Sequence, residues 1–177
     1  KITKYENNYY FSDLSKKAID LCKKNAQKNK FAITAKAGNL FDPWKNQKFN
    51  IIVESVSGIA KKVANFSPWY PEEVPCDAGE DGTILINKVL ETGNNYLKKN
   101  GKIIFPIVSF SDKEKILRVA KKNYSKIKLI ISKDWPLPNT MYSKEKMLNE
   151  LKEEGLINFK RKFGLILYTS YIYIGFK

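Results

Sequence analysis

The chain has 177 residues, of which 43% are apolar, and this size and composition suit one domain with a proper core. It has no histidine and only two cysteines, which excludes Ser-His-Asp and Cys-His catalysis, argues against zinc, and favours a reducing, cytoplasmic compartment. No run of about 18 apolar residues and no signal peptide are visible. The net charge of +14 fits attraction to RNA phosphates. It equally fits a compositional habit, because the lysines are spread along the chain.

Hydrophobic periodicity predicts strands and helices that alternate from residue 9 to 132. The predicted strands are 9–13, 32–37, 49–56, 102–110, 126–132 and 165–177. The predicted helices are 15–29, 82–99, 112–123 and 143–154, with Gly101 as the glycine that ends the second of them. Residues 57–79 and 133–142 are predicted to be loops.

This alternation is typical of a single α/β domain, here residues 1–177, with a Rossmann-like, doubly wound, mostly parallel sheet and helices on both faces. Only one short helix separates the last two predicted strands, so we expect the final strand to be antiparallel. Ligands of open α/β sheets lie beyond the carboxyl ends of the strands. The positions that follow strands are Asp13, Gly38–Asn39, Glu54–Gly58 and the residues after Phe105.

Four segments carry a family resemblance. They are "SDLS" at 12–15, "GNLF" at 38–41, "FNIIVESVSG" at 49–58 and "GEDGTILINKVLETGNNYLKKNGKIIF" at 79–105. In this order, with an antiparallel final strand, they resemble class I S-adenosylmethionine-dependent methyltransferases, above all the branch that methylates glutamine side chains of release factors and related small-domain enzymes. The resemblance implies a seven-stranded sheet, S-adenosylmethionine as cofactor, and methyl transfer to a protein side chain or an RNA base.

The resemblance also implies cofactor-binding residues. Asp13, with the adjoining Leu14, stands where the family binds the ribose, and an ionised carboxylate can accept hydrogen bonds from both ribose hydroxyls. The alternative for Asp13 is a structural role at the N-terminus of the next helix. Asn39 stands where the family usually has an acidic residue that reaches the adenine amino group, and Leu40 can pack on the adenine face. The alternative for Gly38–Asn39 is a plain turn.

The end of the third predicted strand departs from the family. The glutamine and adenine methyltransferases carry Asn-Pro-Pro-Tyr or Asp-Pro-Pro-Tyr there, whereas this chain has Ser55, Val56, Ser57 and Gly58 after Glu54. Ser55 can make one hydrogen bond but cannot present a paired amide. Glu54 is a candidate general base if it points into the site, and Ser57 a candidate substrate contact. Methylation of a planar nitrogen is therefore in doubt, although methyl transfer is not.

Residues 68–82 are expected to form the lip of the pocket. Trp69 and Tyr70 supply a surface on which a substrate can stack. This segment also holds five acids, Glu72, Glu73, Asp77, Glu80 and Asp81. They suit a cationic substrate, or else Glu80 and Asp81 stabilise the start of the next helix and the others are solvated.

The family's glycine-rich turn, which binds the methionine part of the cofactor, has no counterpart in these residues. We expect either that the first strand and its turn lie upstream of Lys1, or that the chain does not bind cofactor normally. The alternative function is a non-catalytic module that binds RNA or a protein partner. A nicotinamide-dependent enzyme is a third interpretation, against which the antiparallel final strand argues. We expect no metal and no membrane contact.

Overall fold

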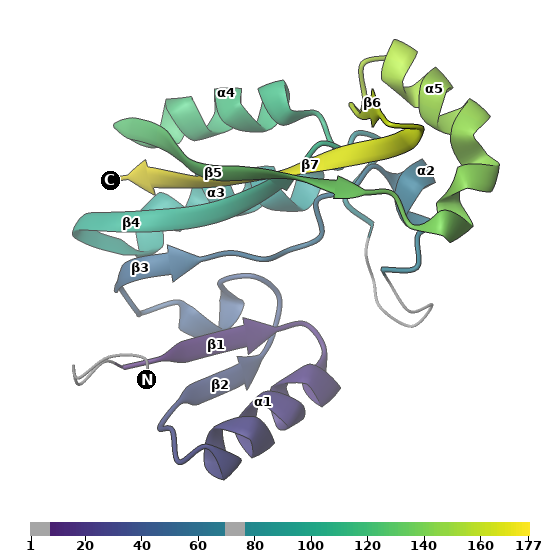
Figure 1. The fold of residues 1–177 in the computed structure, drawn as a ribbon. Coiled ribbons are helices and arrows are strands. Elements are labelled where there is room, and N and C mark those ends of the chain that lie inside the picture. Colours follow the sequence, from purple (N-terminus) through teal and green to yellow (C-terminus); the bar gives the residue numbers. More distant parts are fainter. Residues whose placement is uncertain (1–7, 70–76) are drawn as a thin grey trace. The chain divides into compact units, whose positions relative to one another are not determined.

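The computed structural model describes residues 8–69 and 77–177, and the chain divides into two compact units, residues 1–47 and 48–177 (Figure 1). We call them the N-terminal unit and the C-terminal unit. The N-terminal unit contains β1 (Tyr10–Asp13), α1 (Lys16–Lys28), β2 (Thr34–Ala37) and the 3-10 turn η1 (Asp42–Trp44).

In the N-terminal unit, β1 and β2 pair in parallel, with Asp13 opposite Ala37 at their carboxyl ends. The helix α1 between them begins after Ser15, whose hydroxyl accepts a hydrogen bond from the Ala18 N–H at 3.3 Å. This cap satisfies one of the backbone donors that the first turn leaves without a partner. The buried Ile19 anchors the helix, and the predicted helix 15–29 is confirmed to within one residue at each end.

The C-terminal unit holds the remaining elements. The strands are β3 (Phe49–Val53), β4 (Leu97–Val108), β5 (Lys126–Pro136), β6 (Lys160–Lys162) and β7 (Leu165–Phe176). The helices are α2 (Lys61–Ala64), α3 (Ile84–Gly93), α4 (Lys113–Asn123) and α5 (Glu145–Glu153), with 3-10 turns η2 (Asn94–Tyr96) and η3 (Asn139–Lys144).

The sheet of the C-terminal unit has the order β3-β4-β7-β5, and β6 pairs with the start of β7. β3 and β4 are parallel, whereas β7 runs antiparallel to both β4 and β5. The last strand of the chain thus lies between two strands made earlier. The predicted α/β fold with an antiparallel final strand is confirmed.

One face of this sheet is covered by helices. Its buried side chains include Ile103 and Phe105 of β4 and Tyr173 of β7, whose ring stacks on that of Phe105 at 5.7 Å. The helices α3 and α4 lie on this side (Figure 1). Gly175 of β7 leaves room there for Tyr124 at the end of α4, because a Cβ atom at Gly175 would stand 3.1 Å from that ring. We call this the covered face.

A second apolar cluster lies beyond the carboxyl ends of β4 and β5. It joins the loop after β3, the helices α2 and α5, and the residues on either side of β6. Its largest fully buried members are Phe110, Met141, Leu148, Leu151 and Ile166. This cluster holds the loops at the carboxyl edge of the sheet in place.

The predicted helix 82–99 is wrong at its C-terminal end. α3 stops at Gly93, and β4 begins at Leu97 rather than at 102. Gly101 does not end a helix but lies buried within β4, after Asn100 with a φ of +62°. The Asn-Gly pair marks a bend in the strand, where the pairing of β4 with β3 changes register.

Two further predictions, both of loops, are corrected, and one strand was missed. Residues 133–136 continue β5, since an edge strand tolerates a proline at its end. The predicted loop 57–79 contains the short helix α2. The strand β6 was not predicted, because its hairpin turns at Phe163 and Gly164 with positive φ at both, and phenylalanine gives no turn signal.

Candidate functional site

At the carboxyl edge of the N-terminal unit, Asp13 stands directly before α1. Its Oδ1 accepts a hydrogen bond from the Ser15 N–H at 2.7 Å, and its carbonyl accepts one from the Gly38 N–H at 2.9 Å. Ser15, rather than Asp13, is the capping residue of α1. No described residue bonds to Oδ2, and the side chain is exposed. Asp13 therefore shapes the turn into α1 with one oxygen and presents the other to solvent.

Asn39 and Leu40 follow β2 at the same edge. The Asn39 carbonyl accepts a hydrogen bond from the Asp42 N–H at 2.9 Å, which closes a turn and leaves the amide side chain exposed. The Ser12 hydroxyl donates to the Leu40 carbonyl at 3.3 Å and so ties this turn to β1. The N-terminal unit thus brings Asp13, Leu14, Asn39 and Leu40 together, with Leu14 exposed on the outside.

In the C-terminal unit, Glu54 follows β3 and is only 6% exposed. Its N–H donates to the Ile104 carbonyl at 3.0 Å, so the residue still pairs with β4. Its Oε2 accepts from the Val56 N–H at 3.0 Å, while Oε1 is buried without a hydrogen-bond partner among the described residues. Burial raises the pKa of Glu54 to about 7, although the Val56 N–H acts in the opposite direction. A carboxyl group with this pKa can exchange a proton near neutral pH.

The serines after Glu54 differ in exposure. Ser55 is exposed, and Ser57 is half-buried on the way to the buried pair Ile59 and Ala60. Together with Glu54 they form a second group of predicted site residues, within the C-terminal unit.

Three loops meet at the carboxyl edge of the C-terminal unit. The Ala60 N–H donates to the Phe110 carbonyl at 2.7 Å, the Lys61 N–H to the Gly79 carbonyl at 3.0 Å, and the Asp112 N–H to the Asp81 carbonyl at 2.9 Å. These bonds join the segment after β3, the segment before α3 and the segment after β4. The backbone groups of the three loops thus pair with one another at this edge of the sheet.

Gly82 lies at the point where the three loops meet. Its φ is +71°, and a Cβ atom there would stand 2.6 Å from the Ala60 nitrogen and 2.9 Å from the Ser111 Cβ. Only glycine adopts this conformation readily at such close approach. The sequence stretch "GEDG" signals a turn, but not which loops converge on it.

Asp81 stabilises the start of α3. Its Oδ1 accepts hydrogen bonds from the Thr83 N–H at 3.1 Å and the Thr83 hydroxyl at 2.8 Å, and Lys115 of α4 lies 2.5 Å from Oδ2. Burial acts to raise the pKa of Asp81, but these contacts together outweigh it and hold that pKa below its usual range. This agrees with the structural role weighed for Asp81, and Lys115 is a partner that sequence reasoning missed.

Trp69 packs against the second apolar cluster. Its ring centroid lies 5.2 Å from that of Tyr168 and 6.1 Å from that of Phe110, so the side chain is half-buried rather than fully displayed. Tyr70, together with Glu72 and Glu73, lies outside the described residues. A role for Trp69 in stacking on a substrate stays a prediction.

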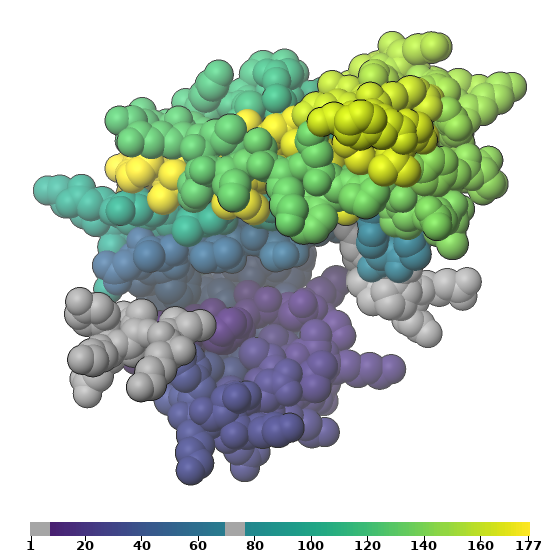
Figure 2. Space-filling view, viewed as in Figure 1, coloured from purple at the N-terminus to yellow at the C-terminus, as the bar shows by residue number. Residues whose placement is uncertain are grey.

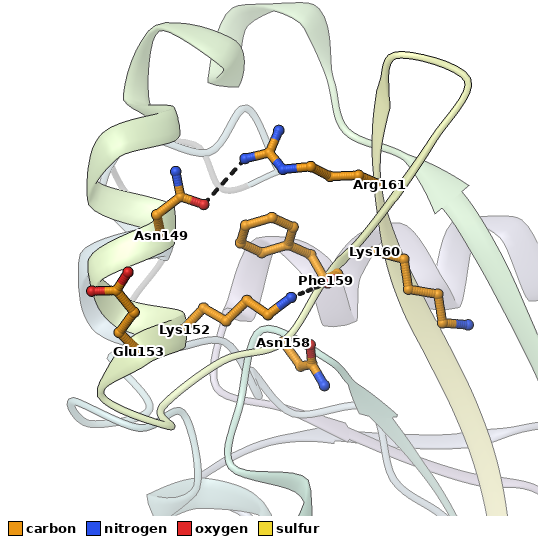
Figure 3. A pocket seen from close by; sticks show the side chains of 7 residues that line it. All are labelled: Asn149, Lys152, Glu153, Asn158, Phe159, Lys160 and Arg161. Atoms are coloured by element: carbon orange, nitrogen blue, oxygen red, sulfur yellow. Dashed lines mark hydrogen bonds between the residues drawn. The ribbon is translucent and has the colours of Figure 1, made fainter.

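Two hollows lie near the carboxyl edge of the C-terminal unit, and neither was predicted. The larger, of about 720 Å³, lies between α5 and the segment of β6 (Figure 3). Its cations are engaged: Lys152 donates to the Phe159 carbonyl at 2.7 Å and Arg161 to Asn149 at 3.1 Å. The smaller, of about 310 Å³, shares Lys152 and extends to Ser109 and Ser111 directly after β4. The smaller hollow therefore adjoins the loops that meet at Gly82.

Within residues 8–69 and 77–177, no three His, Cys, Asp or Glu side chains are placed to hold a metal ion. In the same residues, every helix is too short or too polar to cross a membrane.

Comparisons with known proteins find solved structures of similar fold at low sequence identity. No family model and no curated protein matches the chain. The YcgJ protein of Bacillus subtilis matches with 12% identity and a TM-score of 0.59, over 96% of this chain and 82% of its own. An arsenic(III) S-adenosylmethionine methyltransferase from Chlamydomonas reinhardtii matches with 12% identity and a TM-score of 0.57, over 96% of this chain and 55% of its own. A methyltransferase from Pyrococcus furiosus matches with 16% identity and a TM-score of 0.48, over 94% and 62%.

The chain thus has the α/β fold of S-adenosylmethionine-dependent methyltransferases. It spans 62% of the Pyrococcus protein and 55% of the Chlamydomonas protein.

Proposed function

We propose that the chain takes part in S-adenosylmethionine-dependent methyl transfer to a protein side chain or an RNA base. The observation that carries this proposal is the fold, which aligns with a methyltransferase at a TM-score of 0.57 over 96% of the chain. A fold alone hosts many functions, so the residues at the strand ends must supply the rest of the argument.

The donors and acceptors of the N-terminal unit suit the adenosine half of the cofactor. Asp13 offers Oδ2 to a ribose hydroxyl, the exposed Asn39 amide can pair with the adenine amino group, and the side chains of Leu14 and Leu40 can flank the base. The described residues hold no glycine-rich turn for the methionine half, and of Gly38, Gly58 and Gly82 only Gly58 is open, with the Gly82 carbonyl oxygen 3.9 Å from its Cβ position. Gly38 packs on Pro43 and Gly82 on Ala60, so protein atoms already fill the space beside both.

When bound, the cofactor supplies a methyl group on a sulfonium that an incoming nucleophile displaces in line. In this proposal Ser55 orients the acceptor group by one hydrogen bond, and Glu54 accepts its proton. A carboxyl group with a pKa near neutrality is suited to that exchange. Ser57 and Trp69 contact the substrate, as does Tyr70.

Replacing Asp13 is the direct test of cofactor binding. We expect Asp13→Asn to weaken S-adenosylmethionine binding at least about tenfold, because the amide keeps an oxygen for the Ser15 N–H but lacks the charge that strengthens bonds to hydroxyls. Isothermal titration calorimetry measures the change. Asp20→Asn, on the exposed side of α1, is the matched control and should leave affinity unchanged. Equal affinity of Asp13→Asn and the parent chain contradicts the ribose role.

The alternative function is a non-catalytic module that binds RNA or a protein partner. The net charge of +14 and the missing Asn-Pro-Pro-Tyr motif support it. A titration of labelled RNA separates it from methyl transfer. Binding that falls steeply with salt, in a chain that shows no affinity for S-adenosylmethionine, favours the module.

A further inference from the structure

The hairpin between β6 and β7 carries a phenylalanine at its tip. Phe163 is 91% exposed, more than any other large apolar side chain of the described residues. Its φ is +50°, and that of the following Gly164 is +73°. Two-residue turns with two positive φ values favour asparagine or aspartate before the glycine, so phenylalanine is strained there. Neither core packing nor turn geometry therefore explains a phenylalanine at this position.

The stem of this hairpin is held in place on both sides. The Lys160 Nζ lies 3.0 Å from the Asp134 Oδ2 of β5, and the Arg161 Nη1 lies 2.6 Å from the Glu145 Oε1 of α5. Both cations are thus engaged within the protein. Figure 2 shows the atoms of β6 and the start of β7 (yellow-green) at the surface of the C-terminal unit, beside those of α5 (light green). The fixed stem presents the tip to solvent.

The tip combines a charge with a flat ring. Lys162 is exposed and forms no ion pair with residues 8–69 or 77–177. Its Nζ lies 5.2 Å from the centroid of the Phe163 ring. Leu165, its partner across the hairpin, is 46% exposed. A lysine near the ring and an otherwise open aromatic face suit a ligand that carries an anion next to a flat group.

The larger hollow lies beside the same hairpin, between α5 and the segment of β6 (Figure 3). Its volume of about 720 Å³ lies in the range of small-molecule pockets and has room for a nucleotide. Lys152 in its wall donates one of three ammonium N–H groups to the Phe159 carbonyl, so two are left for an anion. The exposed Asn158 side chain makes no hydrogen bond with a described residue. Glu153 is the acid among the lining residues.

We propose that the hairpin tip and the larger hollow together bind single-stranded RNA. One unpaired base stacks on Phe163, and Lys162 and Lys152 bind phosphates. A neighbouring base enters the hollow, where the Asn158 amide bonds to its edge. This inference rests on the proposed function, of whose two acceptor classes it selects the RNA base.

The two hollows connect this surface with the strand ends. They share Lys152 and Asn158, and the smaller one reaches Ser109 directly after β4. RNA bound at the tip and in the larger hollow is therefore led toward the carboxyl edge of the C-terminal unit, where Glu54 and Ser55 lie.

Two other ligands fit less well. An anionic membrane surface would attract the lysines, but Phe163 and Leu165 alone bury too little apolar surface for stable insertion. An acidic peptide would match the charge. Few of its residues offer a flat group that stacks on a ring, however, whereas every nucleotide carries one.

The test measures binding of a labelled RNA of ten uridines to the full chain without cofactor, by fluorescence anisotropy. Phe163→Asn should weaken binding about tenfold, because a stacked base is lost. The same variant should raise the urea midpoint, because asparagine suits a φ of +50°. Weaker binding in a more stable variant cannot result from unfolding. Phe163→Tyr keeps the ring and should bind like the parent chain, whereas Phe163→Leu is apolar without a ring and should bind like Phe163→Asn.

The salt dependence separates phosphate contacts from base contacts. Lys162→Ala should lower the slope of log affinity against log salt concentration by about 0.7, the value for one phosphate contact of a single strand. Lys121→Ala, at an exposed lysine in the last turn of α4, is the matched control and should leave the slope unchanged. Asn158→Ala should weaken binding several-fold without changing the slope.

Parent-like RNA binding by Phe163→Asn or by Phe163→Leu would overturn the proposal. Phosphatidylserine vesicles, or a poly-glutamate peptide, that bind the parent chain and not Phe163→Asn, with RNA binding unchanged, would assign the tip to that ligand instead. RNA binding that depends on Phe163 in a chain without affinity for S-adenosylmethionine would support this inference and contradict the proposed function. Cofactor binding without RNA binding at the tip would overturn this inference alone.

Discussion

Gly82→Ala is expected to lower the free energy of unfolding by about 3 kcal/mol. Two costs add up to this figure: the strain of a left-handed backbone at alanine, and the overlap of the new methyl group with main-chain atoms. The structure gives φ as +71° and places the new Cβ 2.6 Å from the Ala60 nitrogen and 2.7 Å from the Ile59 carbonyl carbon. Both neighbours are main-chain atoms, so no side chain can rotate away. Relief requires the three joined loops to separate.

Gly155→Ala is the matched control for this substitution. Gly155 has a similar φ of +76°, but nothing lies within 4 Å of its Cβ position. Gly155→Ala should therefore lower the free energy of unfolding only by the strain of the left-handed backbone, about 1 kcal/mol. Urea denaturation of the two variants measures the difference. Equal losses would mean that Gly82 is not held between the loops as the structure shows.

Glu54→Gln is expected to stabilise the protein at neutral and alkaline pH by up to about 3 kcal/mol. The physical reason is that the folded state disfavours the ionised form, with the pKa raised from 4.5 to about 7 by burial. Below pH 4.5 the carboxyl is protonated in folded and unfolded chains alike, and it costs nothing. Between 4.5 and 7 the unfolded chain loses the proton first, so stability falls as pH rises. Above 7 the full cost remains.

Glutamine keeps an oxygen for the Val56 N–H and does not titrate. The difference between Glu54→Gln and the parent chain should therefore be close to zero near pH 4 and should increase up to about pH 7. Denaturation curves at a series of pH values measure it, with Glu91→Gln at an exposed site of α3 as the control. A difference that does not depend on pH would contradict a buried, titrating Glu54. A methyl-transfer assay on the same variant tests whether the group that destabilises the fold serves the reaction.

Much of the fold could be predicted from the sequence. Where a periodic apolar stripe and a capping serine coincide, as in α1, the predicted bounds are almost those of the structure. The antiparallel final strand followed from one short helix between two strong strands. The end of α3 could not be predicted, because Lys98 and Lys99 suit a helix as well as a strand. What ends the helix is the pairing of Leu97 with Phe49, a contact across 48 residues.

The sequence predicted which candidate residues follow the strands, but not how buried each side chain is or what it contacts. Glu54 and Ser55 follow β3, which ends at Val53, so strand alternation does not set which way they point, and only the packed structure shows that Glu54 is buried and Ser55 exposed. The smaller hollow is lined in part by Lys152 of α5 and by Ser109, which directly follows the distant strand β4. No local pattern links two such residues, because their proximity results from how the loops pack.

The position of β7 has a consequence for how the chain acquires its structure. Residues 165–176 are made after every other strand of the C-terminal unit, yet they lie between β4 and β5 and join them. During synthesis β4 can pair with β3, but β5 has no neighbour until the final strand emerges. Contacts that span so many residues slow folding. Until β7 inserts, β4 and β5 expose unpaired edges, and aggregation in this interval should decrease when a chaperone binds the nascent chain.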